Sequence, residues 1–349
     1  MKVTKHTWTN IVAALLFLAC VAVVSFVPTP FVTWGPGNTY DLLGDTETAP
    51  MVGVTNVETF ATNGQVRMTT VGVTPADAQV NLIQVLVGYL SPSEDVFPRE
   101  VVYPPQLDTQ TLAAQEAAQM STSQSASIVA ALRAARMPVT ERPMIVSVAA
   151  SGPSAEHLEA GDLVTTVDGH PVTSTQQVED AIKDHSVGDP VLVGYLRGSV
   201  SGTETITTRA SATQPDVPAI GVTMGPGYVY TPRITFGIDP EIGGPSAGLM
   251  FALAIYDKIT TGDLTAGRVV AGTGAIDERG AVGVVGGVKE KAAAAVRDQA
   301  DVFVMPRANC ADLTAPAGVR VVAVATLAEA VEALERLKDP AAPQTSGCA

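Results

Sequence analysis

The stretch Gly244-Pro245-Ser246-Ala247-Gly248 has the pattern G-x-S-x-G, which often carries a nucleophilic serine. A serine hydroxyl is a weak nucleophile until a neighbouring base takes its proton. An α/β-hydrolase needs a histidine after this serine, but the four histidines all precede it: His6, His157, His170 and His185. The chain instead carries Gly286-Gly287-Val288-Lys289-Glu290-Lys291 after the serine, although it has only seven lysines in all. The sequence therefore predicts a Ser-Lys dyad with Ser246 as nucleophile.

The residues around Ser246 predict a turn followed by a helix. Gly243-Gly244 permits a tight backbone turn, Pro245 suits a first helical position, and Leu249–Ile259 is a continuous apolar run. Ser246 would then lie at a helix N-terminus, where free N–H groups can stabilise an oxyanion. The alternative is a serine that only caps the helix. The tetrapeptide alone is weak evidence, because it recurs at Gly152–Ala155, where a simple turn is expected.

The lysine stretch predicts a helix that begins near Lys289 and continues through four alanines. A lysine acts as a base only when neutral, and burial in an apolar site lowers its pKa from about 10.4. Lys289 and Lys291 point about 200° apart on a helix, so only one of them can face the serine. The apolar positions do not decide which. The alternative for each is a solvated helix residue.

Composition limits the classes of function. A net charge of −14 repels nucleic acid, and no basic stripe with interleaved aromatics occurs. The length leaves room for two or three domains. Neither a nucleotide-binding G-x-x-x-x-G-K-[ST] nor an H-E-x-x-H or other cluster of metal ligands occurs in the sequence, so we expect no metal, no cofactor and no ATP-driven unfolding. A disulfide between Cys310 and Cys348 is conceivable, and two unpaired thiols are the alternative.

An apolar run of 17 residues, Ile11–Val27, follows Lys2 and Lys5. It is near the short limit for a membrane-spanning helix, and the lysines favour a cytoplasmic N-terminus. The alternatives are a cleaved signal peptide, disfavoured because no A-x-A precedes Pro28, and lipoprotein cleavage at Cys20, disfavoured because the apolar run continues past it. We expect an uncleaved single-pass anchor in the cell membrane, with everything after residue 28 outside the cytoplasm.

The rest of the chain divides by composition. Short strands are predicted at 51–54 and 66–71, a helix over 77–90, and a long helix over 108–136, in one or two pieces. Residues 138–210 change to strands and one helix, residues 211–217 are a polar linker, and residues 340–349 have the character of a disordered tail.

Residues 138–210 resemble a PDZ domain through Ala160–Val172 and a closing strand that ends in Arg197-Gly198. In that family a strand and a later helix form a groove to which a peptide adds as an extra strand. The resemblance implies a module that binds substrate or regulates activity. A packing module without a ligand is the alternative.

Residues 219–337 resemble the proteolytic domain of Lon-type serine proteases. The matching pieces are the G-P-S motif, Thr273-Gly274 and the G-G-x-K-E-K pattern. The resemblance implies that Lys291 is the base, that Thr273 helps to hold this lysine, and that Gly244, Pro245 and Ala247 support the nucleophile. Lon-like domains commonly form rings, so it also implies a homo-oligomer.

The fold class expected is α+β and multidomain: a transmembrane helix, a small mixed α/β region, a PDZ-like β-sandwich or barrel and a Lon-type α/β proteolytic domain. The domains expected are 1–10 cytoplasmic, 11–27 anchor, 28–137 strands and helices outside the cytoplasm, 138–210 PDZ-like, 211–218 linker, 219–338 proteolytic and 339–349 tail. This layout resembles a bacterial subgroup of membrane-anchored, PDZ-containing Lon-like proteases.

The function expected is ATP-independent serine endopeptidase activity on extended or unfolded polypeptides outside the cytoplasm. The main alternative is a PDZ-based binding or scaffold protein whose Lon-like domain is inactive. A Ser-Lys amidase or peptidase acting on cell-wall material is less favoured, because no S-x-x-K signature occurs.

Overall fold

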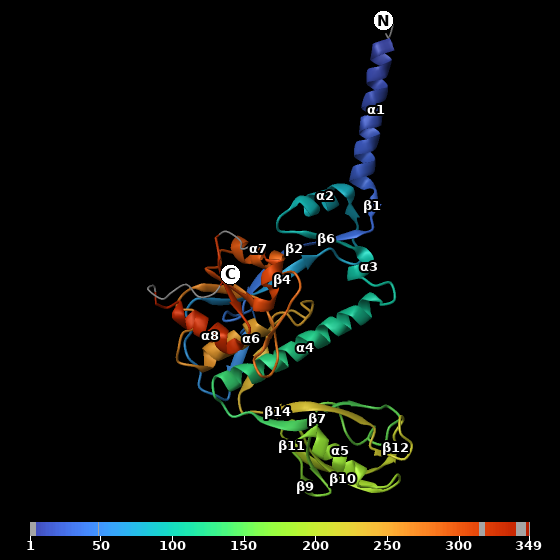
Figure 1. Cartoon of the computed structure of the whole chain (residues 1–349), viewed down its shortest axis with the longest axis vertical. Coiled ribbons are helices and arrows are strands. Elements are labelled where there is room, and N and C mark those ends of the chain that lie inside the picture. The colour runs from blue at the N-terminus through green and yellow to red at the C-terminus, as the bar shows by residue number, and fades with distance from the viewer. Residues whose placement is uncertain (1–4, 48, 314–317, 340–346, 349) are drawn as a thin grey trace. The chain divides into compact units, whose positions relative to one another are not determined.

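The computed structural model describes residues 5–47, 49–313, 318–339 and 347–348. The chain forms two compact units (Figure 1). The first unit is discontinuous and combines residues 1–137 with 232–349, whereas the second unit consists of residues 138–231. The two segments of the first unit are therefore far apart in sequence and pack together only in the folded chain.

An N-terminal helix, α1 (Lys5–Phe26), begins the described chain, and its stretch Trp8–Phe26 is long and apolar enough to cross a membrane. Its apolar side chains are exposed. Composition and length alone fit a membrane anchor and a signal sequence equally well. Strand β1 (Pro28–Thr29) follows at once and pairs with β5 (Val80–Asn81), which leads into helix α2 (Leu82–Leu90).

A six-stranded mixed sheet forms the centre of the first unit, in the order β20-β19-β16-β4-β2-β6. The strands β20, β19, β16 and β4 are parallel, while β2 and β6 run antiparallel to their neighbours. Their bounds are β2 Phe31–Asp41, β4 Gln65–Val73, β6 Asp95–Pro98, β16 Val269–Gly272, β19 Val302–Pro306 and β20 Arg320–Val324. Half of this sheet therefore comes from the first 98 residues and half from the last third of the chain.

Helices α3, α4, α6, α7 and α8 and the 3-10 helix η1 complete the first unit. Helix α4 packs on α6, and α7 packs on β2 and β4 (Figure 1). The bounds are α3 Arg99–Val102, α4 Thr109–Ala134, α6 Gly248–Ile259, α7 Val288–Arg297, η1 Arg307–Asp312 and α8 Leu327–Arg336. Helix α6 is almost wholly buried, as its unbroken apolar sequence predicts.

Two short pairings add to the first unit: β3 (Val52–Thr55) with β15 (Arg233–Phe236), and β17 (Ala275–Ile276) with β18 (Val282–Gly283). A disulfide joins Cys310 to Cys348, the pairing that the sequence left open. It ties the end of the described chain to η1. The rest of the predicted tail, 340–346 and 349, lies outside the described residues, as do residues 1–4.

The second unit is built on one sheet, in the order β11-β10-β8-β7-β14, with β9 beside β8. Its strands are β7 Thr140–Val148, β8 Leu163–Val167, β9 His170–Pro171, β10 Pro190–Arg197, β11 Val200–Thr207 and β14 Val222–Val229. Helix α5 (Thr175–Lys183) buries Val178 and Ile182 against Ile145, Val164 and Val191. One apolar core therefore holds this unit together.

Two expected boundaries differ from the structure. Residues 28–137 were expected as a separate region, but their strands complete the sheet of the first unit. Residues from 219 were expected to begin the proteolytic domain, but β14 pairs antiparallel with β7 and belongs to the second unit. The expected linker, 211–218, lies within that unit, between β12 (Arg209–Ala210) and β13 (Pro218–Ala219).

Candidate active site

The nucleophile candidate, Ser246, lies in the turn just before α6 and is partly exposed. The turn is possible because Gly244 has a φ of +87°, a backbone conformation that side chains disfavour. No side chain of the described residues caps the N-terminus of α6. The positive end of the α6 dipole therefore lies next to the serine, while the Leu249 N–H donates to the Gly274 carbonyl oxygen.

Two hydrogen bonds fix the backbone of Ser246. Its carbonyl oxygen accepts from the Thr273 hydroxyl at 2.9 Å and from the Gly274 N–H at 2.8 Å. Both residues follow β16, so the central sheet sets the position of the serine. The resemblance implied that Thr273 holds the lysine. The hydroxyl is instead bonded to the serine's own backbone.

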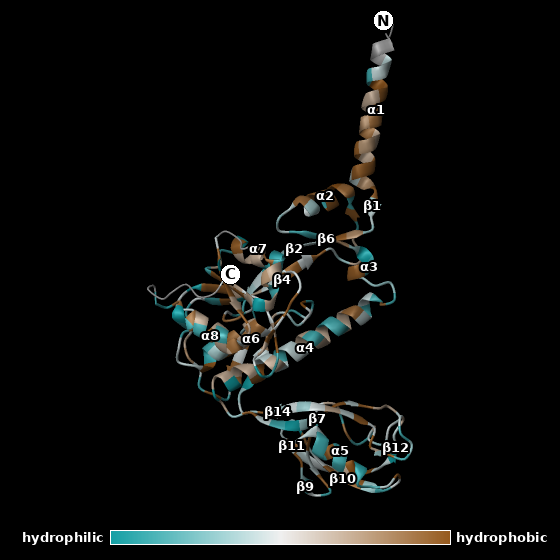
Figure 2. Cartoon of the chain, viewed as in Figure 1, coloured by the Kyte–Doolittle hydropathy of each residue, from teal (hydrophilic) through white to brown (hydrophobic). Residues whose placement is uncertain are grey.

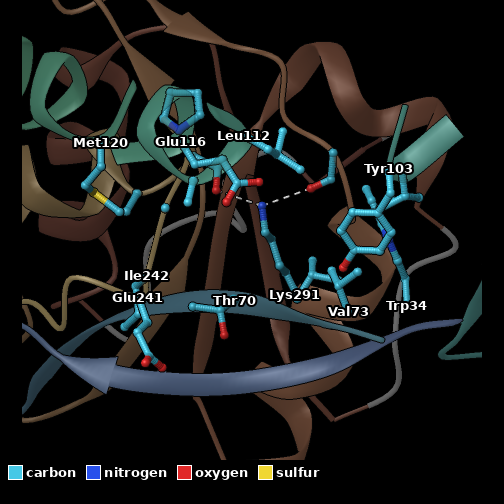
Figure 3. A pocket seen from close by; sticks show the side chains of 18 of the residues that line it. Trp34, Thr70, Val73, Tyr103, Leu112, Glu116, Met120, Glu241, Ile242 and Lys291 are labelled. Carbon is cyan, nitrogen blue, oxygen red and sulfur yellow. Dashed lines mark hydrogen bonds between the residues drawn. The ribbon is translucent and has the colours of Figure 1, made fainter. Parts of the chain in front are cut away.

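Lys291 reaches Ser246 from helix α7. Its Nζ lies 2.9 Å from the Ser246 Oγ and 2.9 Å from the carbonyl oxygen of Gly286 (Figure 3). Lys291 is only 4% exposed. Burial lowers the pKa of Lys291 to about 8, against the opposing charge of Glu290. About a tenth of the amine is then neutral at pH 7, and neutral amine is the form that accepts a proton.

Lys289 points away from the serine, as the helical spacing predicts for one of the two lysines. Its Nζ donates to the Glu94 carbonyl oxygen at 2.7 Å and forms an ion pair with Asp95. Burial alone would raise the pKa of Asp95, but hydrogen bonding and the charge of Lys289 hold it below its usual value. Lys289 therefore links α7 to β6 and does not contact Ser246.

Helix α4, from the N-terminal half, holds the other side of the nucleophile turn. The Ser123 hydroxyl donates to the Pro245 carbonyl oxygen at 2.9 Å, and the Glu116 carbonyl oxygen accepts from the Gly244 N–H at 3.1 Å. Nothing in the local sequence of this polar helix indicated such a role. The one signal that could have drawn attention to it was its length.

Two family models match this chain. Residues 119–208 match the PDZ domain model, and residues 236–336 match the model of the Lon protease C-terminal proteolytic domain. The chain carries a PDZ domain and a Lon-type proteolytic domain. The resemblance drawn from the G-P-S and G-G-x-K-E-K patterns is therefore confirmed, and this pair of domains indicates proteolysis as the class of activity.

Curated relatives match the Lon-type part. The Lon protease of Rhizobium meliloti is 32% identical over 148 residues, which cover 36% of this chain and 18% of that protein. The Lon protease of Malacoplasma penetrans is 36% identical over 103 residues, 25% of this chain and 13% of that protein. The chain spans less than a fifth of the length of these relatives.

Solved structures match the PDZ domain. The PDZ domains of SdrC-like proteins from Listeria monocytogenes and Listeria innocua are each 32% identical and cover 24% of this chain, with TM-scores of 0.22. The matches span 86% and 92% of those solved chains.

A cavity of about 780 Å³ in the Lon-type domain is lined by Ser246 and Lys291. Figure 3 shows Lys291 extending into it, with Leu112, Glu116 and Met120 of α4 among its lining. These three residues are spaced four apart and so share one face of the helix. Further lining residues come from β2, β4, the end of α3 and the segment before the nucleophile: Trp34, Thr70, Val71, Val73, Tyr103, Glu241 and Ile242. The wall is largely apolar, which suits uncharged side chains.

Glu290 carries a buried carboxyl group and directly precedes Lys291. It is fully buried, and among the described residues neither of its carboxylate oxygens has a hydrogen-bond partner. Burial raises the pKa of Glu290 to about 7, and the neighbouring charge of Asp95 adds to the rise. When ionised, Glu290 favours the charged form of Lys291. The protonation state of Glu290 therefore affects the pKa of Lys291.

Within the described residues, one edge of the PDZ sheet is formed by a strand that follows the rest of the domain in sequence. Strand β14 ends the sheet beyond β7, and α5 packs against both strands. Gly221, directly before β14, has a φ of +76°. The strand follows the rest of the domain in sequence and lies beyond residue 210, where the sequence predicted that the PDZ-like domain ends. Within the described parts of the chain, no three His, Cys, Asp or Glu side chains gather as a metal site.

Proposed function

We propose that this protein is an ATP-independent, membrane-anchored serine endopeptidase with Ser246 as nucleophile and Lys291 as general base. The observation that carries the proposal is the 2.9 Å approach of a buried amine to a hydroxyl that lines a cavity. Proximity of the amine to the hydroxyl is not enough for catalysis, because a charged amine cannot accept a proton. The lowered pKa of Lys291 supplies the neutral amine that the reaction needs.

The first step is attack of the Ser246 Oγ on the carbonyl carbon of a peptide bond. The neutral Lys291 amine accepts the hydroxyl proton as the new C–O bond forms, and the resulting ammonium then gives that proton to the departing amine. The N–H groups at the start of α6 stabilise the negative oxygen of the tetrahedral intermediate.

The second step is hydrolysis of the acyl-enzyme. The amine, neutral again after the first product leaves, takes a proton from water as the water attacks the ester carbonyl. Bond cleavage then returns the proton to Ser246. The contact between Lys291 and the Gly286 carbonyl oxygen keeps the amine directed at the site through both steps.

Thr273, Gly244, Pro245 and Ala247 act by positioning the nucleophile. Thr273 fixes the serine's carbonyl oxygen, the left-handed Gly244 shapes the turn, and Pro245 accepts the hydrogen bond of Ser123. Ala247 is buried at the start of α6, where a larger side chain would displace the turn.

The substrates we propose are extended or unfolded polypeptides. The sequence carries no nucleotide-binding loop to drive unfolding. A peptide can add to the exposed edge of β14, beside α5, through backbone hydrogen bonds. By resemblance to ring-forming Lon-like domains, a homo-oligomer is part of the proposal.

The location we propose is the cell membrane, with the N-terminus in the cytoplasm and both folded units outside it. The apolar helix α1 supports the anchor. The disulfide between Cys310 and Cys348 supports an oxidising compartment, because thiols stay reduced in the cytosol.

A serine-reactive fluorophosphonate probe tests the proposal. The full chain should be labelled, and Ser246→Ala and Lys291→Ala should not. Ser154→Ala is the matched control, because its serine lies in the same tetrapeptide, and it should label like the wild type. Labelling that persists in Ser246→Ala would show that the nucleophile is wrong. Failure to degrade casein without ATP would favour a scaffold with an inactive Lon-like domain.

A further inference from the structure

Helix α2 exposes an apolar surface that the proposed reaction does not use. Leu86 is 55% exposed, Val87 57%, Tyr89 78% and Leu90 71%, and Leu82 and Ile83 are exposed as well. At about 100° per residue these six side chains span an arc of about 160°. Soluble surfaces seldom carry such a continuous patch without a partner.

The opposite side of α2 is already packed. Gly88 is its only buried residue, and a side chain there would meet Val96 and Thr33 on β6 and β2. The helix is therefore fixed to the sheet by one face and presents the other outward. The outward face is a feature of the folded unit rather than of a loose segment.

The patch lies where α1 ends. Pro28 pairs with Asn81 and Thr29 with Val80, and the Thr29 hydroxyl donates to the Val80 carbonyl oxygen at 2.7 Å. Cα atoms paired in this way are about 5 Å apart. Asn81 therefore lies beside Pro28, just after the end of α1, and Leu82 begins α2 at the next position. Helix α2 also contacts α1.

The composition of this segment matches a lipid boundary. No charged residue occurs between Asp77 and Glu94, although 16% of the chain is charged. Figure 2 shows apolar residues along α1 and again on α2. A nine-residue helix is about 14 Å long, so α2 cannot extend far from the point where α1 leaves the hydrocarbon.

We infer that α2 is an interfacial membrane helix, which buries Leu82, Ile83, Leu86, Val87, Tyr89 and Leu90 in the outer face of the bilayer that α1 spans. The inference rests on the proposed anchor. Interfacial helices bury an apolar face at the boundary of headgroups and acyl chains, and a tyrosine such as Tyr89 suits that depth. The helix would hold the Lon-type domain against the lipid at a second point beyond α1.

The test uses the full chain in phosphatidylcholine nanodiscs, with an environment-sensitive fluorophore on one cysteine at a time. The native Cys20 reports on α1. Tyr89→Cys and Val200→Cys, each in a Cys20→Ser background, report on α2 and on an exposed site of the second unit. Cys310 and Cys348 are joined and do not react. Lipids that carry a doxyl quencher should extinguish most emission at 20 and 89 and leave 200 bright.

Each other outcome overturns the inference in a distinct way. Quenching at 20 but not at 89 keeps the anchor and rejects the interfacial helix. No quenching at 20 rejects the anchor. If the fluorophore at 89 is unaffected by quencher lipid but changes its emission as the protein concentration rises, the patch contacts a second copy of the chain instead of lipid.

A double variant provides a further check. Leu86→Lys with Leu90→Lys should abolish quenching at 89. Probe labelling of Ser246 should stay unchanged, which would show that the domain remains folded.

Discussion

The tetrapeptide Gly-Pro-Ser-Ala occurs twice, at 152–155 in the PDZ domain and at 244–247 in the Lon-type domain. Ser154 is fully buried, and its hydroxyl donates to the Ile220 carbonyl oxygen at 2.6 Å. Ser246 is partly exposed, lines a cavity and lies 2.9 Å from an amine. The Ser154 hydroxyl donates to a backbone carbonyl, which cannot act as a base, whereas the Ser246 hydroxyl lies beside a lysine amine.

The comparison shows that four identical residues do not determine chemistry. Both segments form turns, because glycine and proline dictate the backbone in each. The difference lies in what the rest of the chain places opposite the hydroxyl. A backbone carbonyl makes Ser154 a structural residue, whereas α7 places a buried lysine against Ser246.

The largest loss of activity is expected when Lys291 is replaced. Lys291→Ala should lower kcat/KM for a fluorogenic peptide by at least about 10³-fold, because members of a catalytic unit carry effects of that size. Lys289→Ala is the matched control from the same helix, since its side chain contacts Glu94 and Asp95 instead. Equal losses in the two variants would contradict the assignment of the base.

The pH profile should follow the amine of Lys291. The neutral fraction of a group with a pKa of about 8 rises about 50-fold between pH 6 and pH 8. For a substrate without titrating groups, log kcat/KM should therefore climb below pH 8 and level off above it. Glu290→Gln should shift this limb to lower pH, because the charge of Glu290 raises the pKa of Lys291. A flat profile from pH 6 to pH 8 would contradict the assignment of Lys291 as the base.

Removing a hydrogen bond to the backbone of Ser246 should lower kcat by an intermediate amount. Thr273→Val removes one of the two hydrogen bonds to the Ser246 carbonyl oxygen. A loss of about 1–3 kcal/mol corresponds to about 5- to 150-fold in kcat, with KM little changed, and Thr273→Ser should restore most of the activity. Because Thr273 has no hydrogen bond to Lys291 among the described residues, the pH limb should stay in place.

The smallest effect is expected at the other tetrapeptide. Ser154→Ala leaves the Ile220 carbonyl oxygen without its buried donor, which should lower the free energy of unfolding of the PDZ domain by about 1–3 kcal/mol. Denaturant titration measures that loss. Peptide hydrolysis by the folded variant should equal that of the wild type. A loss of hydrolysis comparable to that in Lys291→Ala would mean that the two serines are not distinct.

Local features of both motifs could be read from the sequence. The apolar run after Ser246 predicted α6, the alanines after Lys291 predicted α7, and helical spacing predicted that a single lysine would face the site. The family models confirm the domain types that these patterns indicated.

The features that could not be read were non-local. The alternation in β4 marks a strand but does not show that one of its two neighbours is β16, from the last third of the chain. The role of Ser123 depends on how α4 crosses the nucleophile turn, and β14 joins the PDZ sheet after a polar segment that resembles a linker. The resemblance linked Thr273 to the lysine, but a short motif does not show which acceptor its hydroxyl reaches. In the structure that acceptor is the Ser246 carbonyl oxygen.

The pairing of Gln65 in β4 with Val269 in β16 has a consequence for biosynthesis. About 200 residues separate the two strands, and a ribosome needs roughly 10–40 s to add them at the usual elongation rate. Throughout that interval the PDZ segment can already fold, while the edge of β4 that will pair with β16 stays open. Until the last third of the chain emerges, this unpaired edge leaves the nascent chain prone to aggregate.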